Sequence, residues 1–250
     1  MPITVLSENI YWFVGAPFGG KPPGDPNPRV IHDLVDIWQD LSPDVVCLQE
    51  VPSERGYDLI LRALAERSLP AEGPYLPGVE IARYGGAVFH RTGKRVTDSA
   101  QSGVETQRVW QIVDIPLKFS DTLRIANVHL PSNRVIGPQA GAELRVNEMR
   151  TMLDVVGQPD IICGDCNDPP RGAVWNLLAE RGYHDAADLA GQPDSVTTIG
   201  DKRVDYIFIS DRIAHKFDAY GVVPAYRVAT DIPGLEHLSD HLPVWIRIRD

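Results

Sequence analysis

The sequence predicts a single α/β domain built around layers of β-sheet. Short apolar runs rich in β-branched residues alternate along the whole chain with longer segments of helical spacing. No repeat, low-complexity tract or linker interrupts this alternation. Because a chain of 250 residues can bury one large core, we expect residues 1–250 to fold as one domain.

The expected strands are the runs in which β-branched and apolar residues are concentrated. In chain order they are Ile3–Leu6, Asp44–Leu48, Gly86–Phe89, Val109–Ile115, Leu123–Leu130, Asp160–Cys163, Val204–Ile209 and Leu242–Ile248. The expected helices are Arg29–Leu41, Glu54–Ser68, Ala140–Val156 and Gly172–Arg181.

The third expected helix has apolar residues at largely helical intervals, which predicts one apolar face. These residues are Leu144, Met149, Met152, Leu153 and Val156. The stretch from Gly15 to Pro28 holds five Pro and four Gly, so it is predicted to be a loop rather than a linker.

The composition is that of a soluble globular protein, with 43% hydrophobic and 23% charged residues. No basic run followed by an apolar core of signal-peptide length lies near the N-terminus. Asp, Arg or Gly interrupts each apolar stretch, so no segment is expected to span a membrane. We therefore expect a cytoplasmic protein.

The formal net charge of −10 and the pI of about 5.1 act against binding of long polyanions, because non-specific nucleic-acid affinity comes mainly from Lys and Arg. A bound cation and a local Arg cluster can still invert the sign of the potential at one site. Nucleic acid is therefore not excluded. Nucleotides, phospholipid head groups and other small phosphoesters become more favourable partners.

The three cysteines, Cys47, Cys163 and Cys166, do not form the even set that a disulfide framework requires. Cys163 and Cys166 have C-x-x-C spacing, which permits a redox or zinc interpretation. Against it, Cys163 ends an apolar run and no second C-x-x-C or His pair follows. We predict buried, reduced thiols that pack as small apolar residues.

Polar side chains occur where several of the expected strands end. They are Asn9, Glu50, His129, Asp165 and Asn167. Such groups are costly to bury unless they are paired or bind a cation, and functional sites of layered folds collect at strand ends. These residues therefore predict one shared site, although each alone has an ordinary structural explanation.

Glu50 and Asn9 offer a carboxylate and an amide oxygen, which are the ligands that Mg²⁺ prefers. The structural alternatives are a solvent-exposed strand-end Glu and a turn-forming Asn. Asp165 and Asn167 lie two apart, so in an extended segment both would point the same way. Asp165 could then orient or deprotonate an attacking water while Asn167 holds the water or a phosphate oxygen. An Asp-x-Asn turn is the structural alternative.

The C-terminal Ser239-Asp240-His241 segment precedes the last expected strand. If Asp205 meets His241, it fixes the imidazole tautomer and raises the imidazole pKa, which favours proton donation to a phosphate. His129 supplies a second imidazole. The alternative for each is a structural His at a strand end.

Taken together, these motifs resemble the endonuclease/exonuclease/phosphatase superfamily of metal-dependent, DNase I-like phosphoesterases. The resemblance extends from Asn9 to His241, and its motifs occur in the family's order: the Asn, Q-E, His, G-D-x-N, Asp and S-D-H motifs. It implies that Asn9, Glu50 and Asp240 bind Mg²⁺ or Mn²⁺. It implies catalytic roles for His129, Asp165, Asn167, Asp205 and His241.

The resemblance also implies a four-layer αββα sandwich, in which two mixed β-sheets lie face to face with helices outside. Residues 164–167 read G-D-C-N where the family has G-D-F-N, which should cost packing volume rather than chemistry. The signatures of the AP endonuclease and inositol 5-phosphatase subgroups are not found, so both subgroups are disfavoured.

Substrate contacts are less well specified. Arg108 could hold a phosphate bidentately, together with Asn167, or be a surface Arg at a strand start. The segments Gly15–Pro28, Tyr75–Gly86 and Pro131–Gly141 are expected to be loops that rim the pocket. Four aromatic residues could stack on a base or cover the core. They are Tyr11, Trp12, Phe18 and Tyr84.

The resulting hypothesis is a Mg²⁺- or Mn²⁺-dependent hydrolase of phosphodiesters or phosphomonoesters, acting by in-line attack of water. The substrate would be a nucleic acid, nucleotide, phospholipid or small phosphoester. Two alternatives are a phosphoester-binding module without catalysis and a redox centre at Cys163 and Cys166. The complete motif set argues against the first, because a decayed site should lack at least one member.

Overall fold

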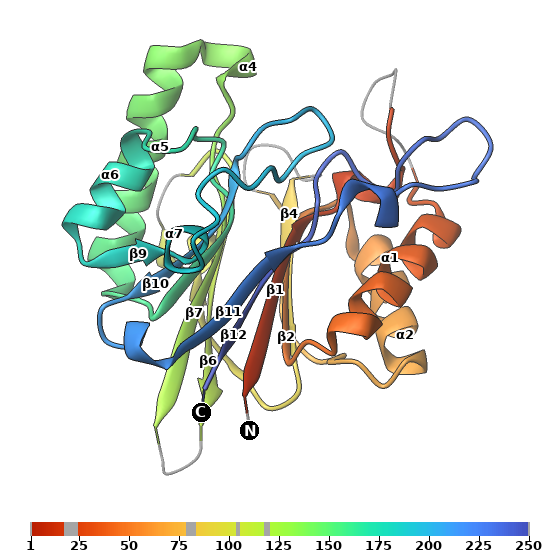
Figure 1. Cartoon of the computed structure of the whole chain (residues 1–250), viewed down its shortest axis with the longest axis horizontal. Coiled ribbons are helices and arrows are strands. Elements are labelled where there is room, and N and C mark those ends of the chain that lie inside the picture. The colour runs from red at the N-terminus through yellow and green to blue at the C-terminus, as the bar shows by residue number, and fades with distance from the viewer. Residues whose placement is uncertain (1, 18–24, 79–83, 104–105, 118–120, 250) are drawn as a thin grey trace.

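Two six-stranded sheets face each other in the computed structural model, which describes residues 2–17, 25–78, 84–103, 106–117 and 121–249 (Figure 1). The first sheet contains, in spatial order, β11 (Phe217–Val222), β12 (Val244–Ile248), β1 (Ile3–Asn9), β2 (Val45–Val51), β4 (Gly85–His90) and β3 (Tyr75–Leu76). The second contains β5 (Lys94–Asp98), β6 (Val109–Pro116), β7 (Thr122–His129), β8 (Ile161–Asp165), β10 (Asp205–Ser210) and β9 (Tyr183–Asp185).

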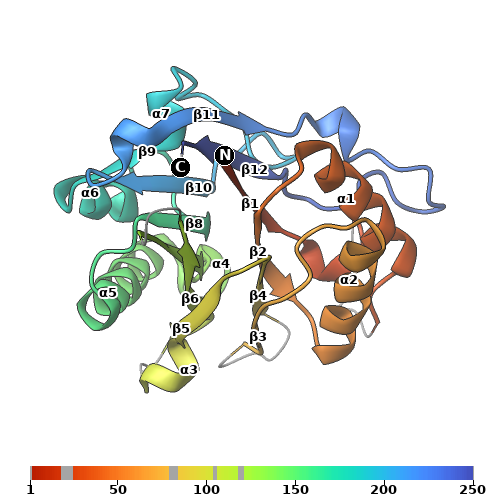
Figure 2. The same ribbon diagram turned by 90° about the horizontal axis from the view of Figure 1, so that it is seen from below.

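Helices cover the outer face of each sheet, as Figure 2 shows. The helices α1 (Pro28–Leu41) and α2 (Glu54–Glu66) pack on the first sheet, and α5 (Pro138–Val156) and α6 (Ala173–Glu180) pack on the second. Shorter helical segments are η1 (Tyr11–Phe13), α3 (Ser99–Ser102), α4 (Asn133–Ile136), α7 (Ala186–Leu189), η3 (Ala214–Lys216) and η4 (Ala225–Arg227). The predicted four-layer αββα sandwich is confirmed.

The central strands read as continuous apolar runs because both of their faces are buried. In β2, Val45 and Cys47 point into the core between the sheets, whereas Val46 and Leu48 point toward α1 and α2. Side chains alternate between the two faces of a strand, so a strand between two layers needs apolar residues at every position.

Two of the helix starts follow from local sequence. The Asn27 side chain accepts a hydrogen bond from the backbone N–H of Arg29, and Pro28 occupies the first helical position of α1. The Ser53 hydroxyl accepts a hydrogen bond from the backbone N–H of Gly56 at the start of α2.

The buried face of α5 differs from the one that its apolar residues predict. Met149 and Met152 are buried as expected, but Leu144 is only half-buried. Arg145 and Glu148 are buried instead, at helical spacing with the two methionines. The apolar residues alone could not show this, because two charged side chains complete the inward face.

Every predicted strand and helix has an observed counterpart, but four strands were not predicted: β3, β5, β9 and β11. Both β5 and β11 are edge strands with largely exposed or half-buried side chains, so they lack an apolar run. The expectation that Pro131–Gly141 is a loop is wrong, because this segment contains α4 and the start of α5. The expected loop Tyr75–Gly86 likewise begins with β3 and ends in β4. Residues 18–24 and 79–83 of the other two expected loops lie outside the described residues.

The three cysteines are free and buried, which confirms the prediction for them. Cys47 and Cys163 pack in the core between the two sheets. Cys166 packs in the separate core beneath α5 and α6. Because Cys163 and Cys166 belong to different cores on opposite faces of the second sheet, their C-x-x-C spacing does not create a thiol pair.

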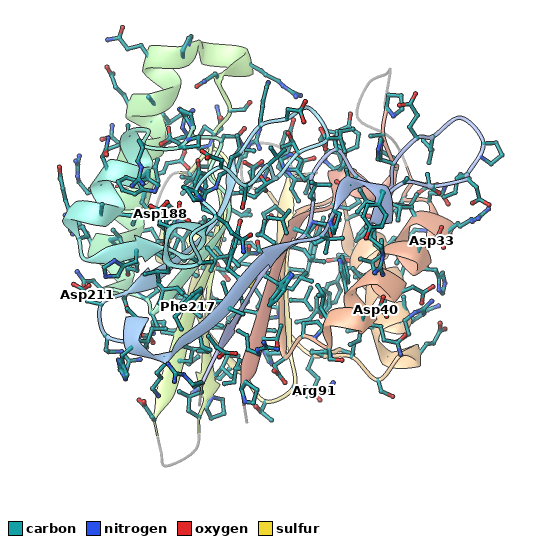
Figure 3. All side chains as sticks on the ribbon, in the orientation of Figure 1. Asp33, Asp40, Arg91, Asp188, Asp211 and Phe217 are labelled. Carbon is teal, nitrogen blue, oxygen red and sulfur yellow. The ribbon has the colours of Figure 1, made fainter. Side chains whose placement is uncertain are left out.

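Within the described residues, no helix is both long and apolar enough to cross a membrane. Acidic side chains occur on the outer flanks of the sandwich, among them Asp33 and Asp40 on α1 and Asp211 after β10 (Figure 3). Part of the net negative charge is thus carried far from the end of the sheets where the strand-end residues gather.

That end is defined by two parallel strand pairs. The strands β1 and β2 run parallel with Asn9 opposite Gln49, and β7 and β8 run parallel with His129 opposite Asp165. The carboxyl ends of all four strands therefore lie at one edge, away from both chain termini (Figure 1).

Near this edge, Glu8 is fully buried against α1 and accepts a hydrogen bond of 2.6 Å from Trp38 Nε1. Burial raises the pKa of Glu8 to about 8, from an ordinary value of 4.5. The folded state therefore binds the Glu8 proton more tightly than the unfolded state does. The free energy of unfolding that comes from this tighter proton binding is complete below about pH 4.5 and is lost as the pH rises to about 8.

We predict that Glu8→Gln, which keeps a neutral acceptor for Trp38, matches the wild type in stability at pH 4.5 and exceeds it at pH 9. At pH 9 the free energy of unfolding of the variant should exceed that of the wild type by an amount on the order of 4 kcal/mol. Urea unfolding at several pH values in EDTA measures it. A gap that does not change with pH would contradict the assigned protonation state.

Candidate active site

Asp165 lies at the centre of the predicted site residues. Its Oδ2 is 3.1 Å from Asn9 Nδ2, 3.4 Å from His129 Nε2 and 3.9 Å from His241 Nε2. These partners come from β1, the end of β7 and the segment before β12, so both sheets contribute. Segments far apart in sequence thus converge on one carboxylate.

Glu50 enters this cluster through an irregularity in β2. The register between β2 and β4 shifts between Gln49 and Val51, and Glu50 has a left-handed φ of 61°. A bulge of this kind redirects a side chain, and strained backbone of this kind concentrates at functional sites. Glu50 Oε1 then lies 3.9 Å from both His129 Nε2 and Arg108 Nη1.

The backbone beside Glu50 is fixed by a buried amide network between the sheets. Gln49 Nε2 donates to Asn127 Oδ1 at 2.7 Å and to Ser7 Oγ at 3.1 Å. Asn127 in turn donates to the Leu48 carbonyl at 3.0 Å. Because Asn127 lies two residues before His129, the network sets the spacing of the two sheets at the site.

Asn9 does not present its amide oxygen to the cluster. Its Nδ2 faces Asp165, and its Oδ1 accepts a hydrogen bond of 3.1 Å from the backbone N–H of Tyr11. To serve as an oxygen ligand, as the sequence predicts, the Asn9 amide has to turn so that Oδ1 faces the carboxylates.

His241 and Asp205 form the predicted pair. His241 Nδ1 lies 2.8 Å from Asp205 Oδ2, and both side chains are largely buried. Burial is the largest single influence on the His241 pKa and lowers it, but Asp205, Asp165 and Asp240 together raise that pKa well above its ordinary value. Burial raises the Asp205 pKa to about 6, against the opposing charge of His241. At neutral pH the pair is therefore ionic.

The turn that carries His241 is tied to β1 and to the segment before β10. Ser239 Oγ donates to the Asn9 carbonyl at 2.8 Å and accepts from the backbone N–H of His241 at 3.1 Å. Thr197 Oγ1 accepts from the backbone N–H of Asp205 at 3.1 Å. The two hydroxyls thus fix the two members of the ion pair.

His129 has the opposite charge state. It is fully buried, its Nε2 contacts Arg108 Nη1, and burial together with the Arg108 charge lowers its pKa well below the ordinary value. At neutral pH the site therefore contains one cationic imidazole, His241, and one neutral imidazole, His129. The positive charge beside His129 belongs to Arg108, which is buried rather than on the surface.

Asn167 is close to Asp165, but the backbone that joins them is not extended as the sequence predicted. Its φ is 48°, and its backbone N–H donates to Asp165 Oδ1 at 2.9 Å, so the segment is a turn rather than an extended strand. Its Nδ2 donates to the Leu130 carbonyl at 2.9 Å. Gly164 is required before this turn, because a Cβ there would lie 1.9 Å from the Val128 carbonyl oxygen.

Asp240 is half-buried and borders the cluster, with its buried Oδ1 3.9 Å from His241 Nε2. Burial raises its pKa, with the His241 charge opposing this. Its Oδ1 has no hydrogen-bond partner among the described residues, and neither does Glu50 Oε2. Two buried carboxylate oxygens without donors are the free ligands that a divalent cation requires.

A separate group, Asp165, Asp205 and His241, has one ligand atom each within 4.8 Å of the other two. Asp205 and His241 are paired with each other, so the donor-free oxygens of Glu50 and Asp240 are the better ligands. Carboxylate oxygens suit Mg²⁺ or Mn²⁺ better than softer ions. These two carboxylates therefore fit a divalent cation at this end of the sheets.

An aromatic wall borders the site on the Arg108 side. The Arg108 guanidinium lies 4.3 Å from the centroid of the Tyr84 ring, and that ring meets His129 edge-on at 5.9 Å. Trp12 is buried against Tyr84, whereas Tyr11 and Tyr84 are half-buried. Of the four predicted stacking residues, Tyr11 and Tyr84 are thus partly accessible, and Phe18 lies outside the described residues.

A cavity of about 810 Å³ opens beside Asn167 and His241. Its walls come from the segment around α4, the prolines after Asn167 and residues 193–204. Three basic residues on these walls, Arg134, Lys202 and Arg203, were not predicted as site residues, and Arg203 is buried and paired with Asp185. Nothing local distinguishes them from surface residues, and only the folded chain brings them beside His241.

Comparisons with known proteins agree with the fold. Residues 9–241 match the sequence model of the Endonuclease/Exonuclease/phosphatase family. No curated protein matches the sequence significantly.

Solved structures with the same fold cover nearly the whole chain. An endonuclease/exonuclease/phosphatase from Beutenbergia cavernae has a TM-score of 0.70 and 20% identity, covering 99% of this chain and 71% of its own. TDP2 of D. rerio in complex with a single-strand DNA product has a TM-score of 0.67 and 16% identity, covering 100% and 99%. A mannosyl-6-phosphatase from Bacteroides thetaiotaomicron has a TM-score of 0.69 and 17% identity, covering 99% and 100%.

Proposed function

The chain belongs to the endonuclease/exonuclease/phosphatase family, as its motifs predicted, and on this premise we propose that it is a Mg²⁺- or Mn²⁺-dependent phosphoester hydrolase. The observation that carries the proposal is the convergence on Asp165. A carboxylate with Asn9, His129 and His241 within 3.9 Å of one oxygen combines proton transfer with charge stabilisation in one place.

The residues that would hold the cation are Glu50, Asn9 and Asp240. When bound, the cation supplies neutralisation of the charge on the phosphoryl oxygens. Glu50 and Asp240 each have a buried carboxylate oxygen without a donor among the described residues, so both oxygens can coordinate a cation without losing a hydrogen bond.

In this proposal, Asp165 orients and deprotonates the attacking water. Its Oδ1 is engaged by the backbone N–H of Asn167 at 2.9 Å, which fixes the carboxylate and leaves Oδ2 toward the reaction centre. Asn167 Nδ2 uses one hydrogen to donate to the Leu130 carbonyl, so its side-chain oxygen remains to accept from the water and its second N–H to donate to a phosphate oxygen.

The positive charges flank this centre from two sides. Arg108 can donate to two phosphate oxygens, and Tyr84 supports the face of its guanidinium. His241, kept protonated by Asp205, donates a proton or a hydrogen bond at Nε2 to the ester oxygens. His129 is neutral and acts as a hydrogen-bonding group beside Arg108.

The substrate is proposed to be an organic phosphoester rather than a bare phosphate. The cavity beside His241, about 810 Å³, is the size of a small-molecule site and can receive the organic part of a nucleotide, a phospholipid head group or a nucleic-acid strand end. Its walls carry charges of both signs, among them Arg134 and Lys202 as well as Asp194 and Asp201. A polar organic group therefore fits better than a long polyanion.

A substrate panel with and without a divalent cation tests the proposal. We predict turnover of at least one phosphodiester or phosphomonoester with Mg²⁺ or Mn²⁺, loss of turnover in EDTA, and recovery when the cation is restored. The panel should include single- and double-stranded DNA, RNA, nucleotides, sphingomyelin, inositol phosphates, phosphotyrosyl-DNA and nitrophenyl phosphoesters.

Glu50→Gln provides the matched control, because it keeps the side-chain size and removes the charge. It should need at least about tenfold more cation for half-maximal activity. If no phosphoester is turned over under saturating cation, the hydrolase proposal fails and a phosphoester-binding module without catalysis becomes the better explanation.

A further inference from the structure

Helix α5 carries two buried charged residues that the reaction does not use. Arg145 is 1% exposed and Glu148 is 5% exposed, and they lie three residues apart on the helix face that packs against the second sheet. Apolar residues continue this face at Met149 and Met152. Two charges are costly at such positions unless each makes a specific contact.

Arg145 contacts the segment that follows β7. Its Nη1 donates to the Pro131 carbonyl at 3.2 Å and to Asn133 Oδ1 at 2.7 Å. Its Nη2 donates to Asp168 Oδ1 at 3.2 Å. Pro131 lies two residues after His129, and Asp168 follows Asn167.

Glu148 contacts the segment that precedes β6. Its Oε1 accepts a hydrogen bond of 2.8 Å from the backbone N–H of Gln107, the residue before Arg108. Thr106 Oγ1 donates to the Arg108 carbonyl at 2.9 Å, which is a local hydrogen bond within the same segment.

These two segments extend beyond the last strand pair of β6 and β7, which joins Val109 to His129. Past that pair, the sheet no longer fixes their relative positions. Helix α5 does so instead, because one of its charged residues contacts each segment.

We propose that Arg145 and Glu148 form a brace, two positioning residues that set the spacing of Arg108, His129 and Asn167 around the phosphate. The inference rests on the proposed phosphoesterase function. Glu148 acts through Arg108, and Arg145 acts through the α4 segment and the turn at Asn167. Neither residue touches the substrate.

Gly141 gives an independent probe of the Arg145 half of the brace. A Cβ at this position would lie 2.3 Å from Asn133 Oδ1 and 3.2 Å from Arg145 Nη1. Elsewhere in a helix, replacing Gly by Ala is usually stabilising. Here the added methyl group would displace the side chain that Arg145 holds.

The first experiment compares Glu148→Ala with Glu148→Gln, which keeps an acceptor oxygen. Hydrogen exchange should show loss of protection at the Gln107 amide in the Ala variant and retention in the Gln variant. The Ala variant should lose about tenfold or more in kcat/KM and in affinity for inorganic phosphate, since misplacement of a contact group is costly. The Gln variant should stay within about threefold of wild type.

A double-mutant cycle separates positioning from general damage to the fold. If Glu148 acts through Arg108, Glu148→Ala should change kcat/KM by less than about twofold once Arg108→Ala is present. Additive losses, or unchanged exchange at Gln107 in Glu148→Ala, would overturn the Glu148 half of the brace. If the wild type turns over no ester, the hydrolase proposal fails instead, and exchange together with phosphate affinity still decides the brace.

The second experiment uses Gly141→Ala, with Asn147→Ala on the exposed face of α5 as the control. The Gly141 variant should keep its thermal stability yet show a KM raised about fivefold or more, because the α4 wall of the cavity moves. The Asn147 variant should show neither change. An unaltered KM in a stable Gly141 variant would overturn the Arg145 half.

Discussion

Asp165→Asn is expected to lower kcat by at least about 10²-fold without unfolding the protein. The substitution keeps the size of the side chain and the oxygen that accepts from the Asn167 backbone N–H. The amide nitrogen then takes the place of Oδ2, where it can no longer accept a proton.

Steady-state kinetics on the best substrate of the panel measures this loss, and thermal unfolding checks the fold. Asp211→Asn is a matched control, because Asp211 is an exposed acidic residue on the outer flank (Figure 3). It should retain the wild-type kcat. A wild-type kcat in Asp165→Asn would remove Asp165 from the reaction and with it the centre of the proposed mechanism.

The parts of the fold that could be predicted are those buried on both faces. Val45 to Leu48 in β2 is apolar at every position because the inter-sheet core and the outer helices each take alternate side chains. The edge strands carry no comparable signal. In β11 only Tyr220 is buried, so its pairing with β12 depends on tertiary contacts that the local sequence does not encode.

The motifs predicted which residues would gather at this end of the sheets, but they could not predict the geometry of these residues. The left-handed backbone at Glu50 and Asn167 is imposed by a strand irregularity and by a turn closed on Asp165. The charge difference between the imidazoles of His129 and His241 arises from burial and from neighbours distant in sequence. These effects depend on which segments the fold brings together.

Residues that act through others were the least predictable. Arg145 and Glu148 on a helix suggest a solvent-exposed face by their type alone, and the structure buries both. One sequence signal could have identified them: at helical spacing they continue the inward face that Met149 and Met152 define.

His241→Ala is expected to lower kcat by at least about 10²-fold, because it removes the imidazole that is charged at neutral pH. Asp205→Asn tests how that charge is maintained. Asp205 is the largest of the influences that raise the His241 pKa, so without its charge the pKa falls. The alkaline limb of kcat/KM, which requires protonated His241, should then move to lower pH.

The pH profile separates this role from a structural one. The amide introduced by Asp205→Asn keeps an acceptor oxygen for His241 Nδ1, which lies 2.8 and 3.1 Å from the two carboxylate oxygens of Asp205. The imidazole therefore stays oriented while its charge becomes easier to lose. A structural defect lowers activity equally at all pH values. The electrostatic role requires activity that approaches the wild-type level at acidic pH and declines earlier as pH rises. In the His241→Ala background, Asp205→Asn should have little further effect, because the charge that Asp205 stabilises is already gone.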